Sequence, residues 1–350
     1  MFKILRKMCA VGAGLIFLLL PTQAFAHYDR AYWHEESAAS QFIEQYQDWM
    51  ITIPDNRRLS DISIPGTHDT MAYSATLPFK DIVRTQTMNL RQQLDSGIRY
   101  LDIRLSHEGD VFKIYHGSVY LGVSFNDVLE TISQYLTQFP TETILMRVKQ
   151  EHSRVPDKSM WDLFAKYDQA YPGLFWNRSL NNTDNPTLGQ VRGKVVVLSD
   201  IWGLSQGISY ARLPKQDNYH LTTNWDLYSK WSDVKQEIYR ANSDRSGKIH
   251  LNHLSGSGGA FPYFVASGHS NPETNASRLS TGYTTPGFRH MYPDFPRTAV
   301  FLGIATISFE GTNTLAADYL QQNSISQAGV VIADFPGERL IDAVIQCNYR

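Results

Sequence analysis

Two histidines and an arginine lie at or near the ends of expected strands. His68 and Asp69 follow the run LSDISIPGT, His116 lies near the end of VFKIYHG, and Arg104 lies in YLDIRLS. Two histidines at one site can act as general base and general acid, because one oxygen then loses a proton while another gains one. The planar fork of an arginine is well suited to phosphate. Together these residue types predict the cleavage of a phosphodiester.

Other charged residues hold equivalent places. Asp102 and Arg104 are two residues apart, so both side chains point to the same face of a regular strand, opposite to the apolar residues between and beside them. A buried arginine needs a carboxylate or an anionic ligand, and a purely structural ion pair is the alternative. Lys149, Asp200 and Asp334 also lie at expected strand ends. In a parallel barrel these ends converge on one face, although charges also begin wherever strands leave a core.

A metal site has less support in the sequence. His250 and His253, in HLNH, are three residues apart and therefore lie on opposite faces of a strand, so both are interpreted as structural. Arg104 and Lys149 would repel a cation. We therefore expect an enzyme without a metal ion or other cofactor.

Short β-rich runs alternate with helical segments along the chain. Strands are expected at residues 60–66, 97–106, 111–117, 141–149, 193–200, 247–255, 298–306 and 328–335. Helices are expected at 87–97, with Gly97 as C-cap, and at 124–140, between Ser124 and Pro140. The first strand should end in a turn at Pro65 and Gly66, and residues 172–186 and 205–244 should form long loops. This alternation predicts parallel βα units, in a (β/α) barrel or a doubly wound sheet.

The first 26 residues have the pattern of a secretory signal peptide: three basic residues, a short apolar run and the small residues AFA. The expected organisation is therefore a signal peptide at 1–26 and one domain at 27–350, secreted to the periplasm or the exterior. Without residues 1–26 the chain has 29 basic and 34 acidic residues, a formal charge of −5, which gives no indication of nucleic-acid binding.

Several motifs taken together resemble bacterial phosphatidylinositol-specific phospholipase C, the X-domain family. The motifs are WMITIPDNRRLSDISIPGTHDT, GIRYLDIRLS, YHGSVYLGVSFNDVLETISQYLTQFPTETILMRVKQE and GVVIADF. The resemblance runs from about Trp49 to the C-terminus and is looser in the middle. It implies a single distorted (β/α)8 TIM-type barrel that cuts phosphatidylinositol into diacylglycerol and inositol 1,2-cyclic phosphate.

The resemblance also implies roles for individual residues. His68 matches the general base that takes a proton from the inositol 2-hydroxyl, and Asp334 matches the carboxylate that orients it. His116 matches the general acid for the departing diacylglycerol oxygen. Arg104 matches the group that neutralises the phosphate, and Asp69 is expected to pair with it. Because the substrate supplies the attacking hydroxyl, no serine nucleophile is needed.

Recognition of the lipid is less defined by the motifs. Asp102 and Lys149 are expected at the substrate, while Asp226 and Tyr228, in NWDLYSKW, resemble the acid and the aromatic that contact the inositol ring. Asp200 stands near a position where many members of the family have a basic residue, which leaves the exact head group open.

The loop SGSGGAFPYFVASGHSNP contains Phe261, Tyr263 and Phe264. It is expected to form an aromatic rim that touches the membrane interface transiently, and an ordinary aromatic-lined loop is the alternative.

The protein itself is expected to be a monomer. Two other functions remain open: cleavage of another polyol-phosphate lipid or a glycosylphosphatidylinositol anchor, and a non-catalytic barrel that binds lipid or glycan.

Overall fold

The computed structural model describes residues 31–32, 46–74, 76–204, 206–270 and 277–350. The expected signal peptide at 1–26 lies outside the described residues. Among the residues that are described, no helix is both long enough and apolar enough to pass through a bilayer.

The main sheet confirms the expected barrel in a distorted form. Eight strands run in the order β6-β7-β5-β2-β1-β16-β11-β9, and every neighbouring pair along this path is parallel. Their bounds are β1 Ile64–Thr67, β2 Tyr100–Glu108, β5 Ile144–Gln150, β6 Phe175–Trp176, β7 Val195–Asp200, β9 Lys215–Gln216, β11 Leu251–His253 and β16 Val330–Ala333. Three further strands extend this sheet: β3 Val111–His116 and β4 Val119–Ser124 form an antiparallel hairpin on β2, and β8 Ile208–Ser209 pairs with β7. In the described part of the chain β8 and β9 do not pair, so the barrel is open between them.

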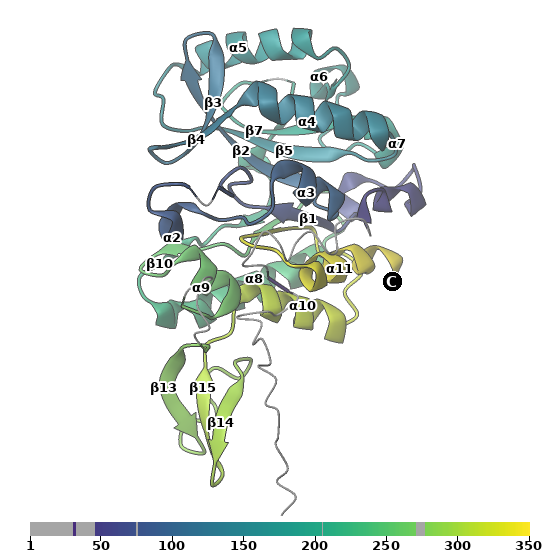
Figure 1. The fold of residues 1–350 in the computed structure, drawn as a ribbon. Helices are drawn as coiled ribbons and strands as arrows, with labels where there is room; N and C mark the ends of the chain where they lie inside the picture. Colours follow the sequence, from purple (N-terminus) through teal and green to yellow (C-terminus); the bar gives the residue numbers. More distant parts are fainter. Residues whose placement is uncertain (1–30, 33–45, 75, 205, 271–276) are drawn as a thin grey trace, which may run out of the picture.

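Helices cover the outside of the curled sheet (Figure 1). They are α2 Lys80–Val83, α3 Leu90–Asp95, α4 Phe125–Gln138, α5 Asp157–Ala170, α6 Arg178–Asn181, α7 Leu188–Val191, α8 Leu227–Ser243, α9 Pro262–Ser267, α10 Thr312–Gln322 and α11 Glu338–Gln346. The two expected helices are confirmed as α3 and α4. Ser124 caps α4 by accepting from the backbone N–H of Asp127, and Gly97 has the positive φ of 103° that ends α3.

Three sequence expectations about the fold are wrong. Pro65 and Gly66 are not a turn but lie within β1, where Gly66 is opposite Tyr100 of β2. Residues 298–306 are not one barrel strand, because the chain reverses at Leu302 and Gly303, both with positive φ, to form a hairpin. Both expected long loops contain regular elements: 172–186 contains the barrel strand β6 and the helix α6, and 205–244 contains the 17-residue helix α8, in which Trp231 is buried.

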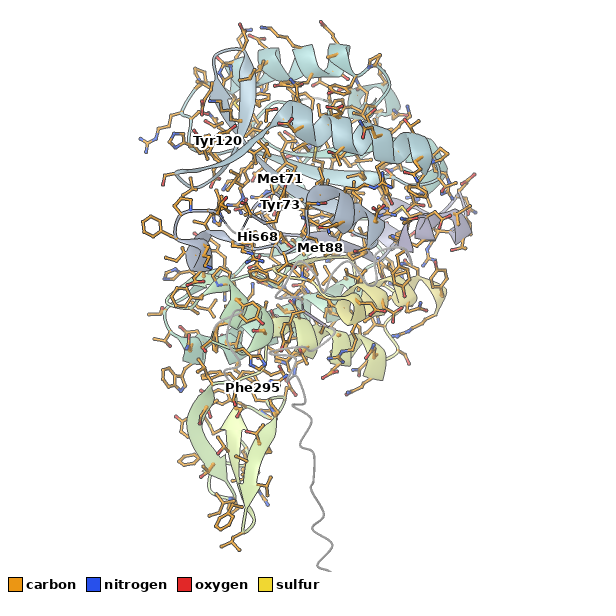
Figure 2. All side chains as sticks on the ribbon, in the orientation of Figure 1. His68, Met71, Tyr73, Met88, Tyr120 and Phe295 are labelled. Atoms are coloured by element: carbon orange, nitrogen blue, oxygen red, sulfur yellow. The ribbon has the colours of Figure 1, made fainter. Side chains whose placement is uncertain are left out.

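That hairpin belongs to a separate antiparallel sheet that projects from the barrel (Figure 1). Its strands are β13 Ser280–Thr285, β14 Arg297–Phe301 and β15 Ile304–Ser308, in the order β13-β15-β14. Figure 2 places Phe295 where this sheet joins the body, and its ring contacts those of Tyr228 and Phe309. The remaining short pair, β10 His220–Leu221 and β12 Ser257–Gly258, is parallel.

We predict that Gly66→Ala destabilises the fold and weakens any activity of the site that follows β1. An added Cβ would lie 2.8 Å from both Cβ and Cδ1 of Tyr100, and neither of these central strands is free to move away. Such overpacking costs about 1–3 kcal/mol, measurable as a lower urea midpoint. Gly287→Ala is the control, since only the Thr284 carbonyl at 4.0 Å comes near its added Cβ. Equal midpoints for the two variants would contradict the prediction.

Candidate active site

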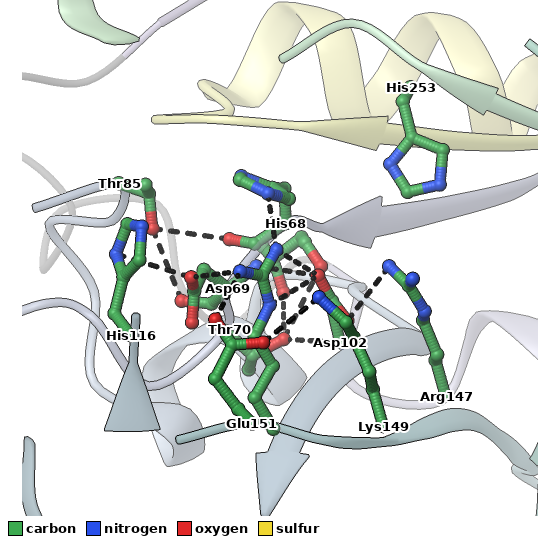
Figure 3. A network of polar contacts seen from close by, with 12 residues as sticks. His68, Asp69, Thr70, Thr85, Asp102, His116, Arg147, Lys149, Glu151 and His253 are labelled. Carbon is green, nitrogen blue, oxygen red and sulfur yellow. Dashed lines mark hydrogen bonds and ion pairs between the residues drawn. The ribbon is translucent and has the colours of Figure 1, made fainter. Parts of the chain in front are cut away.

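The carboxyl ends of β1, β2, β5 and β16, with the end of β3, bring one polar cluster together (Figure 3). It contains all five residues with an expected catalytic role: His68, Asp69, Arg104, His116 and Asp334. Asp102, Lys149 and Asp200 are joined to the same cluster by ion pairs. The carboxyl ends of parallel strands lie at the same end of the barrel, so residues up to 266 positions apart in the sequence meet here.

His68 is held by one partner on each ring nitrogen. Its Nδ1 lies 2.8 Å from Oδ1 of Asp334, and its Nε2 lies 2.7 Å from Nη2 of Arg104. A guanidinium can only donate hydrogen bonds, so Nε2 must accept and Nδ1 must carry the proton that is donated to Asp334. The basic lone pair of His68 therefore points at the arginine, where an anionic group would bind.

The backbone around His68 is fixed by its neighbours. Asp69 has a φ of 45°, in the left-handed region that a non-glycine residue adopts at a cost. The Thr85 hydroxyl lies within 3.2 Å of the carbonyls of both His68 and Asp69, and the Gln86 amide donates to the His68 carbonyl at 2.7 Å. These bonds hold the turn after β1 in the shape that presents both side chains to the cluster.

Arg104 lies at the centre of the cluster and is surrounded by carboxylates. Its Nη1 lies 3.0 Å from Oδ2 of Asp69 and 3.4 Å from Oε1 of Glu151, and its Nη2 lies 3.1 Å from Oδ2 of Asp102. Burial alone would raise the pKa of Asp102, but Arg104 and Arg147 hold it well below its usual range. The expected pairing of Asp69 with Arg104 is therefore present in the structure.

His116 approaches from the opposite side of Asp69. Its Nδ1 lies 2.8 Å from the Val83 carbonyl and 3.2 Å from Oδ2 of Asp69. A carbonyl oxygen only accepts, so Nδ1 carries a proton. The neighbouring Gly117 donates its backbone N–H to Glu151 at 2.9 Å, which ties the end of β3 to the same carboxylate that contacts Arg104.

Two cluster residues were not expected. Arg147 is buried and donates to Oδ2 of Asp200 at 2.6 Å and to Oδ1 of Asp102 at 3.4 Å, while Glu151 joins Arg104 to Lys149. The signal that could have found them is the two-residue period of β5: positions 147 and 149 point to the same face, and Glu151 comes at the same spacing directly after the strand. Asp200 is thus the partner of a basic residue on the neighbouring strand.

The structure does not bring Asp226 and Tyr228 to this cluster. Asp226 accepts from the backbone N–H groups of Thr222 and Thr223 at the start of α8, and the Tyr228 hydroxyl donates to Asp294 near the projecting sheet. Their Asp-x-Tyr pattern has a second copy nine positions earlier in the chain, at Asp217 and Tyr219.

That second copy directly follows the barrel strand β9. The Asp217 carboxylate acts electrostatically on His253 and Tyr210, both at the barrel interior, and the ring of Tyr219 is exposed. The sequence signal for these two residues is the position of QDNY at the end of the strand Lys215–Gln216, but this strand is too short to be predicted from the sequence. Asp217 and Tyr219 thus directly follow a barrel strand, whereas Asp226 and Tyr228 lie at the start of α8.

His250 and His253 do lie on opposite faces, but only His250 has a purely structural setting. His250 is bound between Glu237 and Asp244, at 2.7 and 2.8 Å, away from the cluster. His253 faces the interior: its Nε2 lies 2.9 Å from the Tyr210 hydroxyl and its ring centroid lies 6.3 Å from that of His68. The structural interpretation of His253 is therefore revised.

The aromatic loop is only partly exposed. Phe261 is 51% exposed, but Tyr263 and Phe264, in α9, are 3% and 2% exposed and pack into the body. Tyr263 and Phe264 are therefore unavailable for the expected rim, because α9 turns its whole length into the core. Phe79 and Ile82, in the segment that follows β1, are exposed instead.

The chain resembles known proteins over both its sequence and its fold. Residues 62–200 match the family described as phosphatidylinositol-specific phospholipase C, X domain. A 1-phosphatidylinositol phosphodiesterase of Listeria monocytogenes is 37% identical over 224 residues, which cover 60% of this chain and 68% of that protein. A protein of the same name from Staphylococcus aureus is 29% identical over 294 residues, covering 73% of this chain and 91% of the relative.

A solved structure has the same architecture. The phosphatidylinositol-specific phospholipase C from Listeria monocytogenes superposes with a TM-score of 0.64 and 28% identity, covering 86% of this chain and 98% of that one. The similarity in fold therefore extends over most of this chain.

We predict that His68 titrates far below an ordinary histidine. Burial and the charge of Arg104 lower the pKa of His68 from 6.5 to about 4. Protonation therefore favours the unfolded chain: the contribution of neutral His68 to stability is complete above pH 6.5 and is lost as the pH falls through about 4. Nitrogen NMR of the labelled imidazole, assigned with a His68→Gln variant, measures this midpoint. A native midpoint of 6.5 or higher would rule out the arrangement described for Nε2.

Proposed function

Because the chain belongs to the phosphatidylinositol-specific phospholipase C family, we propose that it cleaves phosphatidylinositol into diacylglycerol and inositol 1,2-cyclic phosphate. The observation that carries the proposal is the placement of His68 and His116 around Arg104 and Asp69, with the Nε2 lone pair of His68 accepting a hydrogen bond from the guanidinium that a phosphate would bind. This arrangement offers a base, a cation for phosphate and an acid within one cluster.

The reaction needs two proton transfers around one phosphorus atom. Nε2 of His68 takes the proton of the inositol 2-hydroxyl, and that oxygen forms the new bond to phosphorus. The bond from phosphorus to the diacylglycerol oxygen breaks, and protonated His116 gives this oxygen its proton. Asp334 accepts the Nδ1 hydrogen bond of His68 at 2.8 Å and stabilises the imidazolium that forms. Burial raises the pKa of Asp334, while the neighbouring charges of His116 and Arg104 act to lower it.

Arg104 supplies the positive charge for the phosphate. Every carboxylate of the cluster has a side chain partner: Asp69, Asp102 and Glu151 contact Arg104, Asp200 contacts Arg147, and Asp334 contacts His68. A divalent cation would have to displace these partners to use the same oxygens. The site is therefore better suited to a guanidinium than to a metal ion, and the proposed mechanism is independent of metal.

The lipid substrate requires the protein to work at a membrane surface, and we propose that it is exported to do so. The pattern of residues 1–26 supports export. Exposed Phe79, Ile82 and Phe261 lie in segments that follow β1 and β11, on the face where the site opens. Apolar and aromatic side chains in such positions favour a brief interfacial contact.

The mature protein is expected to convert phosphatidylinositol vesicles to the cyclic inositol phosphate in excess EDTA, as followed by phosphorus NMR. His68→Ala and His116→Ala should each lower the rate by at least about 100-fold. Arg104→Lys should also cause a large loss without unfolding, because an ammonium cannot reproduce the geometry of the fork.

The outcomes separate the alternatives. Inhibition by EDTA would refute the role given to Arg104, and so would full activity of Arg104→Lys. If the protein cleaved only another polyol-phosphate lipid, that lipid would be its substrate instead of phosphatidylinositol. If it bound lipid but cleaved none, the function as a non-catalytic binding protein would be supported.

We further propose that Asp217, rather than Asp226, contacts the hydroxyl groups of the inositol ring. Its carboxylate follows β9 at the barrel interior, whereas Asp226 has its oxygen occupied at the start of α8. Asp217→Asn should lower kcat/KM for phosphatidylinositol by at least about tenfold, since hydrogen bonds to a charged group are worth 1.5–3 kcal/mol, roughly. Asp226→Asn, the matched control, should change kcat/KM less than twofold after correction for stability. The reverse ranking would restore the interpretation based on Asp226 and Tyr228.

A further inference from the structure

The hairpin of the projecting sheet ends in a run of apolar residues that the described part of the chain leaves exposed. Residues 299–304, AVFLGI, are all exposed, and we refer to them as the apolar tip. Val300, Phe301 and Leu302 are 68%, 72% and 86% exposed, and Ile304 is 50% exposed. Four large exposed apolar side chains in one short run are unusual on a protein surface and indicate an interaction site.

The stem of the same sheet is polar. Its strands carry Thr281, Thr298 and Ser308, whose hydroxyls bond within the sheet: Thr298 to Ser308 at 2.6 Å, and Thr281 to the Ile307 carbonyl at 2.7 Å. No charged residue occurs between positions 298 and 309. Along β14 and β15 the exposed large apolar side chains are therefore concentrated at the far end, while Phe288 and Met291, in the connection between β13 and β14, are also exposed.

The base of the sheet is firmly attached to the body. The Phe295 ring packs against Tyr228, Tyr292 and Phe309, with centroids 5.2, 5.3 and 5.8 Å away. The guanidinium of Arg297 donates to the carbonyls of four residues in the preceding connection, Arg289, Met291, Tyr292 and Phe295. The tip is thus held away from the core by a braced stem.

We propose that the apolar tip inserts into the interfacial region of a lipid bilayer and acts as a second membrane contact beside the mouth of the barrel. In Figure 1 the sheet projects below α9, on the side where α2 and β10 follow the carboxyl ends of β1 and β9. The tip is therefore the part of the projection that lies furthest from the body, where a membrane surface can reach it. The choice of a bilayer as partner rests on the proposed lipid substrate.

The backbone of the tip disfavours a second copy of the chain as partner. Strand β14 lies at the edge of its sheet, but Ala299 and Leu302 both have a φ of 47° and the pairing register shifts between Thr298 and Phe301. Such irregularities interrupt the row of backbone groups that edge-to-edge pairing requires. Insertion of side chains into lipid makes no such demand.

The test is binding of the full protein to vesicles of phosphatidylcholine alone, so that it does not depend on turnover. The double variant Phe301→Ser/Leu302→Ser should lower the partition coefficient by at least about tenfold. Leu180→Ser, in α6, is the control because Leu180 is 84% exposed at another place on the surface, and it should bind like the wild type. Equal binding by the double variant, or no binding by the wild type, would overturn the proposal.

A labelled residue locates the contact directly. Cys347 is buried and is the only cysteine after residue 26, so Val300→Cys offers one accessible site for an environment-sensitive fluorophore. A blue-shifted emission with vesicles, quenched by spin-labelled lipid, is the expected result. An unchanged emission would overturn the proposal. So would a wild-type dimer in sedimentation velocity, if the double variant were monomeric and still bound vesicles like the wild type. Failure of phosphatidylinositol cleavage with intact tip-dependent binding would refute the proposed function alone.

Discussion

The structure depends on one buried cation, the guanidinium of Arg104. It is 10% exposed as a side chain and is compensated by carboxylates from three successive segments of the barrel: Asp69 after β1, Asp102 in β2 and Glu151 after β5. An uncompensated charge at this depth would cost several kcal/mol, roughly. The register of these strands is therefore tied to the charge balance around Arg104, and both histidines take their positions from the same group of contacts.

This balance also prepares the site for an anion. In the free protein the carboxylates occupy the donors of Arg104, and Nε2 of His68 occupies one more. A bound phosphate would compete with these groups, so part of the attraction between phosphate and guanidinium is spent on displacing them. Ground-state binding is thereby limited, while the charge that develops on the phosphoryl oxygens in the transition state meets a cation that is already in place.

Much of this site follows from the two-residue period of strands. The two-residue period places Asp102 and Arg104 on the interior face of their strand. The same period, applied to β5 and the residue that follows it, places Arg147 and Glu151 on the same face as Lys149. It cannot find β9, because a two-residue strand is too short to show a period. The sequence alone therefore points to Asp226 and Tyr228 and not to the Asp-x-Tyr pattern that follows β9.

The prediction of one strand at residues 298–306 is wrong for a different reason. The run TAVFLGIAT has the composition of a buried strand, yet its chain reversal depends on the local backbone of Leu302 and Gly303. The exposure of residues 299–304 depends on where the hairpin lies relative to the other described segments. Neither property can be read from residue types. Similarly, the burial of Tyr263 and Phe264 depends on where α9 lies in the fold rather than on their aromatic character.

The open side of the barrel raises the question of why its exposed strand edges do not cause aggregation. A sheet that does not close leaves backbone groups free at both ends, and long flat edges of this kind recruit strands from other molecules. Here the path ends at β6 and β9, each two residues long, and β8 adds only two more. Across the gap, Tyr210 stacks on Arg147 and bonds to His253, so side chains rather than a strand bridge the opening. The barrel can therefore remain open without offering a template for aggregation.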